Sequence, residues 1–236
     1  MEAKLAAYLG AGICIGLGAV GSALGEGLAA RDAAGAIARQ PAAAPAVVRT
    51  MLVGQAVAES ASIFALVVAL LLVFNPAGAG GLRAVALFAA GLCMGAGALG
   101  PGVGAGLPAA AACRAVGRSP RSLPRVTTTM LVGQAVAQTP SIFALLVAFL
   151  ILFLKGEGAF TLPAAAAVLG AGISAGFSAV GPGLGAGFAA SAACEATARR
   201  PERAALFLRT MLVGQAVSQS TSIYGLVVAL VLLFVV

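Results

Sequence analysis

The sequence predicts an all-α membrane protein made of three tandem transmembrane helical hairpins, six helices in all. Two observations carry this prediction. The 236 residues are 61% hydrophobic and only 9% charged, whereas soluble domains carry about 25% charged residues. The heptapeptide MLVGQAV begins at Met51 and returns at Met130 and Met211, so the chain repeats with spacings of 79 and 81 residues. A repeat of this kind predicts a fold built from three similar structural units.

Each repeat consists of a glycine-rich apolar helix, a short basic loop with a proline, and a second apolar helix. Crossing a bilayer takes about 20 apolar residues, and every repeat offers two such runs. Helices are expected at residues 5–37, 46–74, 82–116, 124–153, 163–197 and 204–235, in hairpins 1–80, 81–160 and 161–236. The first helix is read as mature protein and not as a signal peptide, because its glycine pattern recurs internally, where no signal can act.

The first helix of each repeat carries closely spaced small residues. Gly21–Gly27 aligns with Gly100–Gly106 and with Gly181–Gly187. In lipid, small residues let helix backbones approach one another closely, so these helices are expected to form an inner circle inside the bulkier second helices. Because each repeat has two helices, all three enter the membrane in the same sense, unlike inverted transporter repeats. The hairpins therefore fit part of a two-layered ring, with a monomeric bundle as the alternative.

Charge is concentrated in the three loops between paired helices. The loop regions contain eleven arginines against three acids: Arg31, Arg39, Arg49, Arg114, Arg118, Arg121, Arg125, Arg199, Arg200, Arg203 and Arg209 against Asp32, Glu195 and Glu202. The opposite side has Lys4, Arg83 and Lys155 with Glu2 and Glu157. The positive-inside rule places the loops in the cytoplasm and both termini outside. The arginines are not clustered as a nucleic-acid footprint would be, and the absence of histidine removes the usual general base.

One carboxylate, Glu59, lies inside the second apolar helix of the first repeat. An ionisable group at membrane depth is expensive and indicates a functional site. Gln138 and Gln219 occupy the equivalent positions in the other repeats. Because an amide cannot change its charge, these two positions are expected to be silent, so that three hairpins share one carboxylate position.

The glycine-rich first helix, the Arg-Gln-Pro loop and the GQAVAES segment together resemble the rotor-ring c subunit (proteolipid) of F-type ATP synthases. Three fused hairpins with missing carboxylates resemble V-type rotor proteolipids. The resemblance implies a homo-oligomeric ring in the inner (plasma) membrane, surrounded by lipid, that carries Na⁺ or H⁺ and turns against a stator a subunit. It also implies a non-catalytic protein without a cofactor. A stand-alone channel or transporter, and a purely structural proteolipid, are the alternatives.

The resemblance also assigns the loops and the ion site. Docking to the central stalk falls to the loop residues Arg39, Gln40, Pro41, Arg118, Pro120, Arg199 and Pro201. Sodium-binding members place a glutamine where this chain has Glu26, so the first hairpin presents two carboxylates to one site, where the other repeats have Ala105 and Ala186. Two nearby carboxylates cannot both ionise unless a cation lies between them. The alternative for Glu26 is a residue at the membrane edge held by Arg31.

The family's sodium signature after the acid is Ser, Thr and, one turn later, Tyr. Repeat 1 keeps only Ser60, whereas repeat 3 has Ser220, Thr221 and Tyr224. Because sites in this family lie between adjacent hairpins, the resemblance predicts that the third hairpin of a neighbouring chain completes the site. Its expected ligands are the Val217 carbonyl, the Ser220 hydroxyl, a water held by Thr221 and the Tyr224 hydroxyl, with Val57 and Ser60 as weaker candidates. Oxygen ligands of this kind suit a hard cation, which favours Na⁺ over H⁺.

Overall fold

The computed structural model describes residues 2–74, 80–153 and 161–234, and within these ranges it confirms the predicted all-α fold. Six helical stretches of the described chain are long and apolar enough to cross a membrane. The elements in chain order are α1 (Glu2–Arg39), η1 (Pro41–Ala43), α2 (Ala44–Ala58), α3 (Ser60–Phe74), α4 (Gly81–Arg118), η2 (Pro120–Ser122), α5 (Leu123–Ala137), α6 (Thr139–Phe153), α7 (Leu162–Ser178), α8 (Val180–Arg199), η3 (Pro201–Arg203) and α9 (Ala204–Phe234).

The predicted boundaries hold to within a few residues, but three interruptions were not predicted. The second helix of the first hairpin is divided at Glu59, and that of the second hairpin at Gln138. The first helix of the third hairpin is divided at Ala179. At each loop a proline opens a short 3₁₀ turn, as expected of a residue that cannot donate a backbone hydrogen bond.

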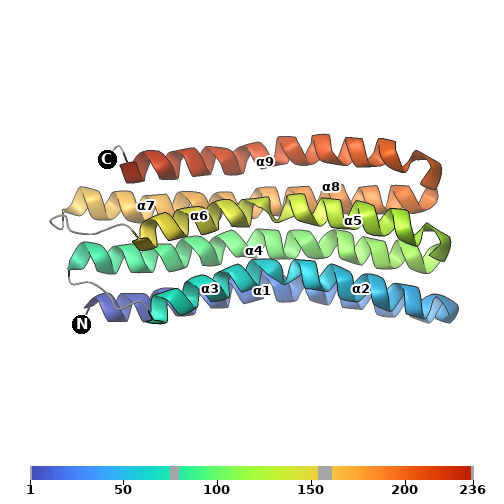
Figure 1. Cartoon of the computed structure of the whole chain (residues 1–236), viewed down its shortest axis with the longest axis horizontal. Helices are drawn as coiled ribbons and strands as arrows, with labels where there is room; N and C mark the ends of the chain where they lie inside the picture. Colours follow the sequence, from blue (N-terminus) through green and yellow to red (C-terminus); the bar gives the residue numbers. More distant parts are fainter. Residues whose placement is uncertain (1, 75–79, 154–160, 235–236) are drawn as a thin grey trace.

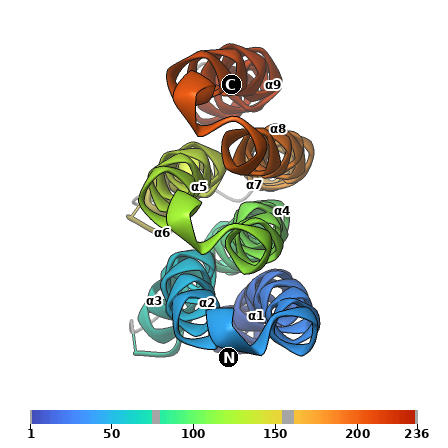
Figure 2. The same ribbon diagram turned by 90° about the vertical axis from the view of Figure 1, so that its right-hand side faces the viewer.

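The hairpins lie side by side in two rows (Figure 2). The first helices α1, α4 and α7/α8 form one row, and α2/α3, α5/α6 and α9 form the other. Both termini lie at one end of the bundle and all three proline loops lie at the other (Figure 1). Lys155 and Glu157, which contribute to the charge predicted for the terminal side, lie outside the described residues.

Glycines allow the first helices to touch along their backbones. A Cβ on Gly91 would collide with the backbone of Gly10, and one on Gly187 would collide with the backbone of Gly104. The predicted role of the small residues in close helix packing is therefore confirmed. The outer edges are different, because a Cβ on Gly12, the repeat equivalent of Gly91, or on Gly181, the repeat equivalent of Gly100, would meet nothing within 4 Å. The molecule thus ends in two unpaired edges that carry the same small-residue pattern as its paired interfaces.

A chain of ion pairs joins the first helices near the loops. Arg114 on α4 pairs with Asp32 on α1 and, at 2.7 Å, with Glu195 on α8. Arg199 lies 3.6 Å from Glu195. These contacts connect all three hairpins at their loop end, where Arg114, Asp32 and Glu195 are only partly exposed.

Candidate ion-binding site

Glu26 on α1 and Glu59 between α2 and α3 lie next to each other halfway along the first hairpin. Two hydrogen bonds fix the helices at this level: the Ser22 hydroxyl donates to the Ala58 carbonyl at 3.0 Å, and Gln55 Nε2 donates to the Glu26 backbone carbonyl at 3.1 Å. The two carboxylates are close enough to interact electrostatically. Glu26 is half-buried and Glu59 is exposed, on the unpaired edge of the first hairpin.

Neither carboxylate has a cationic partner in the described part of the chain. Arg31, the alternative partner considered for Glu26, pairs instead with the adjacent Asp32 at 3.0 Å. A pair of carboxylates without a compensating cation at membrane depth is costly. The arrangement therefore requires protons, a bound cation or a partner that supplies positive charge.

The equivalent glutamines show which way this position faces in an assembled interface. Gln138 Nε2 donates to the carbonyl of Val57 in the preceding hairpin at 3.0 Å. Gln219 Nε2 donates in the same way to Val136 at 2.8 Å. Both glutamines are buried, at 6% and 8% exposure. Each amide of this position therefore reaches backwards along the chain to a valine carbonyl of its neighbour.

A serine three residues further on donates to the backbone carbonyl of each glutamine, at 2.7 Å for Ser141 and 2.8 Å for Ser222, and also approaches the glutamine side chain. The Ser141 hydroxyl lies 3.4 Å from Gln138 Oε1, and the Ser222 hydroxyl lies 3.3 Å from Gln219 Oε1. In the first hairpin the equivalent Ser62 hydroxyl donates to the Glu59 backbone carbonyl at 2.8 Å. The sequence reasoning did not assign a role to these serines, although all three repeats carry one three residues after the acid or amide.

The glutamine of the MLVGQAV motif makes a second contact between hairpins, which the sequence reasoning also missed. Gln134 Nε2 donates to Ala105 O of its own hairpin and to Gly54 O of the preceding one, both at 2.8 Å. Gln215 repeats this with Ala186 at 2.9 Å and Gly133 at 3.0 Å. Among the described residues, Gln55 makes only the bond within its own hairpin, to Glu26. The sequence signal that could have indicated this contact is the recurrence of the glutamine in the second apolar helix of every repeat.

The helix interruption at Gln138 has a local cause in the second hairpin. Pro140 has no backbone N–H, so the Val136 carbonyl loses its helical donor, and the Gln219 amide donates to it instead. In the first hairpin the Val57 carbonyl accepts from both Gln138 and the Ser60 hydroxyl, the latter at 2.8 Å. Helix α9 runs without interruption, and the only side chain of the described chain that bonds its Val217 carbonyl is Ser220, at 2.7 Å.

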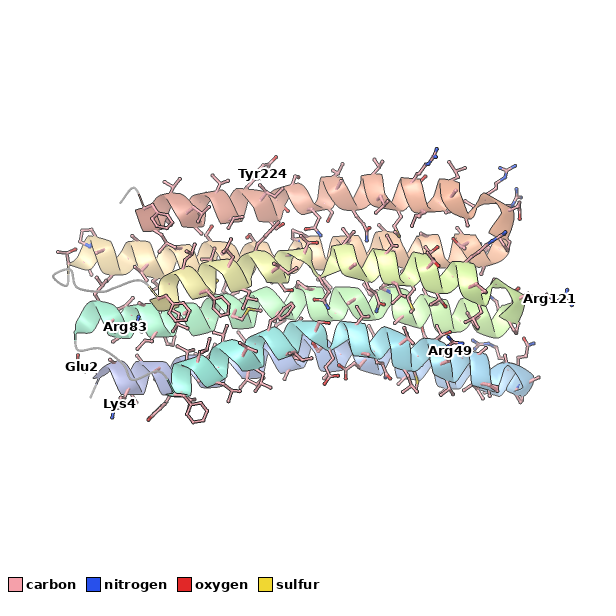
Figure 3. All side chains as sticks on the ribbon, in the orientation of Figure 1. Glu2, Lys4, Arg49, Arg83, Arg121 and Tyr224 are labelled. Carbon is pink, nitrogen blue, oxygen red and sulfur yellow. The ribbon has the colours of Figure 1, made fainter. Side chains whose placement is uncertain are left out.

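The structure does not bring the predicted ligands together within one chain. Glu26 and Glu59 lie on the unpaired edge of the first hairpin. The residues expected to complete the site lie on α9, at the opposite edge of the row of hairpins. Val217 and Tyr224 are 70% and 65% exposed, Thr221 is exposed and Ser220 is half-buried. Tyr224 projects from α9 on the side away from the other hairpins (Figure 3).

The described chain has six membrane-length helical stretches in three parallel hairpins and paired carboxylates near half depth, which define a multi-pass membrane protein with an acidic site in its apolar layer. The chain belongs to the family of ATP synthase C subunits, whose model matches residues 9–72, 88–151 and 169–232. Each matched stretch covers one hairpin, so the resemblance found in the sequence is confirmed, together with the fusion of three hairpins.

Single-hairpin relatives are similar to about a third of this chain. The ATP synthase c subunit 2 of Cereibacter sphaeroides is 51% identical over 74 residues, which cover 31% of this chain and 89% of that protein. The ATP synthase c subunit of Alkaliphilus oremlandii is 53% identical over 72 residues, 30% of this chain and 81% of that protein. That of Thermotoga petrophila is 52% identical over 63 residues, 27% of this chain and 74% of that protein.

Proposed function

We propose that this chain is a c subunit of the membrane rotor ring of a rotary ATP synthase or ATPase. It translocates Na⁺, with H⁺ as the alternative, by reversible binding at Glu26 and Glu59 and couples this binding to ring rotation. The observation that supports it best is the pair of internal interfaces in which Gln138 and Gln219 each bond a valine carbonyl of the preceding hairpin. Each hairpin, at residues 1–80, 81–160 and 161–236, acts as one unit of the ring.

In the proposed ring, the same contact recurs between the first hairpin of one chain and the third hairpin of the next. Glu59 then faces the Val217 carbonyl, and Gln55 faces the Gly214 carbonyl, as Gln138 and Gln134 face Val57 and Gly54. A contact between two different edges of identical chains is heterologous, and it closes into a ring when the rotation per chain allows. The unpaired glycines at both edges support this contact.

This interface gives the carboxylates the ligands expected from the third hairpin. They are the Val217 carbonyl, the Ser220 hydroxyl, the Tyr224 hydroxyl and a water held by Thr221. With Na⁺ and one proton bound, two carboxylates form a neutral site, as passage through lipid requires. The set of oxygen ligands favours Na⁺. Because Gln138 and Gln219 stay neutral, each chain carries one ion. Fewer ions per turn reduce the torque that an ion gradient supplies for ATP synthesis, and they let ATP hydrolysis pump ions against a steeper gradient, which favours ATP-driven pumping.

The arginine-rich loops face the cytoplasm, where Arg39, Gln40, Pro41, Arg118, Pro120, Arg199 and Pro201 dock the central stalk. A stator a subunit supplies the positive charge that the empty carboxylates require. The chain itself does not catalyse ATP turnover and uses no cofactor. It resides in the inner (plasma) membrane with both termini outside.

Carbodiimide labelling of the purified ring tests the proposal, because carbodiimides attack protonated buried carboxyls. Peptide mass spectrometry across a sodium titration is expected to show modification of Glu59 that Na⁺ suppresses near neutral pH. Labelling that depends on pH alone would make the carboxylate pair a proton site and reject the sodium assignment. A Glu59 that never reacts would contradict the rotor function and favour the channel alternative.

A further inference from the structure

A groove lies between the outer helices of the first two hairpins, near the loop end. It has a volume of about 400 Å³ and is lined by Arg49 and Val53 of α2 and by Leu123, Thr127 and Leu131 of α5. Both walls belong to one chain, so the groove stays between these hairpins when chains assemble. Arg49 is exposed and lines the groove together with a largely apolar surface, towards the loop end of the bundle (Figure 3).

Two polar groups of this groove have no partner within the described chain. Arg49 makes no ion pair or hydrogen bond with a described residue, and neither does the Thr127 hydroxyl. The adjacent Thr50 hydroxyl is different, because it donates to the Ala46 carbonyl at 2.9 Å. The groove therefore offers one cation and one hydroxyl donor that the fold itself does not use.

The depth of Arg49 matches the level of lipid phosphates. Arg49 lies ten residues before Glu59, which is about 15 Å along a helix. Glu59 is near the centre of the membrane-length stretch Pro41–Phe74, and half the hydrocarbon thickness is also about 15 Å. The guanidinium thus lies where acyl chains give way to headgroups, while Val53 and Leu131 lie deeper.

We propose that this groove binds an anionic phospholipid. Its phosphate accepts hydrogen bonds from Arg49 and Thr127, and an acyl chain runs along Val53 and Leu131 towards the membrane centre. Basic pockets between transmembrane helices are a known way to hold acidic headgroups. A soluble anion would satisfy the polar end but would leave the apolar walls without an occupant. This site is separate from the ion-carrying carboxylates and from the loop residues assigned to the stalk.

The next groove along the row provides a matched control. The groove between α5 and the start of α9 is smaller, about 240 Å³, and its arginine is Arg125. Its threonine hydroxyls are already satisfied, because Thr128 donates to the Pro124 carbonyl and Thr129 to the Arg125 carbonyl, each at 3.0 Å. It therefore lacks the free hydroxyl donor of the first groove, and its arginine is expected to hold lipid only weakly.

Native mass spectrometry of the complete, delipidated ring tests the proposal, with phosphatidylglycerol titrated back in detergent. We expect one tightly held lipid per chain, bound about tenfold more weakly in Arg49→Gln, because a charge-assisted hydrogen bond is lost, and unchanged in Arg125→Gln. Thr127→Phe fills the groove but keeps Arg49, so it also loses the lipid and decides the matter if the Arg49 variant fails to assemble. Equal retention of phosphatidylcholine, equal loss in both arginine variants, or displacement of the lipid by millimolar inorganic phosphate would overturn the proposal.

Discussion

The two interfaces between hairpins inside the chain and the two unpaired edges are formed by repeat-equivalent helices, but they differ in the side chains that they present. Inside the chain, an amide bonds a valine carbonyl across each interface, and the glycines of adjacent first helices are in backbone contact. At the free edges, Glu59 stands where the amide would be, and Gly12, Gly16 and Gly181 meet nothing within 4 Å. The permanently neutral contacts thus lie between hairpins of one chain, whereas the chargeable position lies on an unpaired edge.

This difference separates the neutral contacts inside the chain from a chargeable position at its edge. An amide that donates to a carbonyl satisfies both groups without a change of charge, as lipid-embedded backbone requires. A carboxylate at the same place satisfies that carbonyl only when it is protonated or when a cation bridges the two oxygens. Substitutions at Glu59, at its equivalents and at their neighbours therefore test whether the charge at this position accounts for the difference between the internal interfaces and the free edges.

The largest effect is expected for Glu59→Gln, which makes the interface between chains resemble the two internal ones. The ring should assemble normally but lose ATP-driven ion uptake in proteoliposomes of the complete complex, because the amide cannot exchange an ion. Gln219→Asn, which keeps a neutral amide at a position expected to be silent, serves as the control. Ion uptake by the Glu59 variant would show that Glu26 alone can carry the ion.

Gly16→Leu and Gly95→Leu change equivalent positions, one at a free edge and one at an internal interface. A side chain on Gly16 meets nothing within 4 Å, whereas one on Gly95 meets the backbone of Cys14 at 3.0 Å. The Gly16 variant should therefore fold but fail to form rings, and the Gly95 variant should lose packing within the chain, since overpacking costs about 1–3 kcal/mol or more. Native mass spectrometry and circular dichroism distinguish these outcomes. Normal rings from Gly16→Leu would contradict the edge-to-edge contact.

Gln138→Glu is expected to create a second, weaker carboxylate site inside the chain. The protonated acid can still donate to the Val57 carbonyl, as Gln138 does now at 3.0 Å. Because Ala105 stands where the first hairpin has Glu26, the new site lacks the second carboxylate and should bind H⁺ but not Na⁺. Carbodiimide labelling of the new carboxyl that depends on pH and is insensitive to sodium would confirm this. Sodium protection would show that one carboxylate is enough.

Ser220→Ala should weaken sodium binding about fivefold, the effect of losing one neutral polar contact of about 1 kcal/mol. Thr139→Ala, at the equivalent position of the second hairpin, should leave it unchanged. Sodium protection against carbodiimide labelling measures both. The opposite pattern would place the second hairpin at the ion site.

The smallest effect is expected at the ion pairs that link all three hairpins. Arg114 bridges Asp32 and Glu195 and is 30% exposed, so Arg114→Gln should cost about 1 kcal/mol of stability, within the range for partly exposed pairs. Resistance to unfolding by a denaturing detergent measures this. Arg118→Gln, which changes an exposed arginine without an ion pair in the described chain, should have no effect.

Much of the fold could be predicted because repeats and hydropathy are local signals. The recurrence of MLVGQAV at Met51, Met130 and Met211 predicted three hairpins, and the apolar runs predicted six helices. The interruption at Gln138 has a signal in the sequence, Pro140, that was not used, whereas the first hairpin has no proline at the position equivalent to Pro140 and its interruption at Glu59 has no such signal. The contacts of Gln134 and Gln215 with the preceding hairpin were missed because an isolated polar residue does not reveal its partner. The ligand set of the ion site stays a prediction.

The sequence by itself determined the membrane class, the number of hairpins and the membrane depth of Glu59, because composition and period are properties of the chain alone. Only the tertiary structure decided that Gln138 and Gln219, the equivalents of Glu59, face the preceding hairpin, as their bonds to Val57 and Val136 show. It also decided that Glu59 lies on an unpaired edge. The physical reason is that a repeat identifies equivalent residues, whereas the direction in which they face depends on how adjacent helices pack.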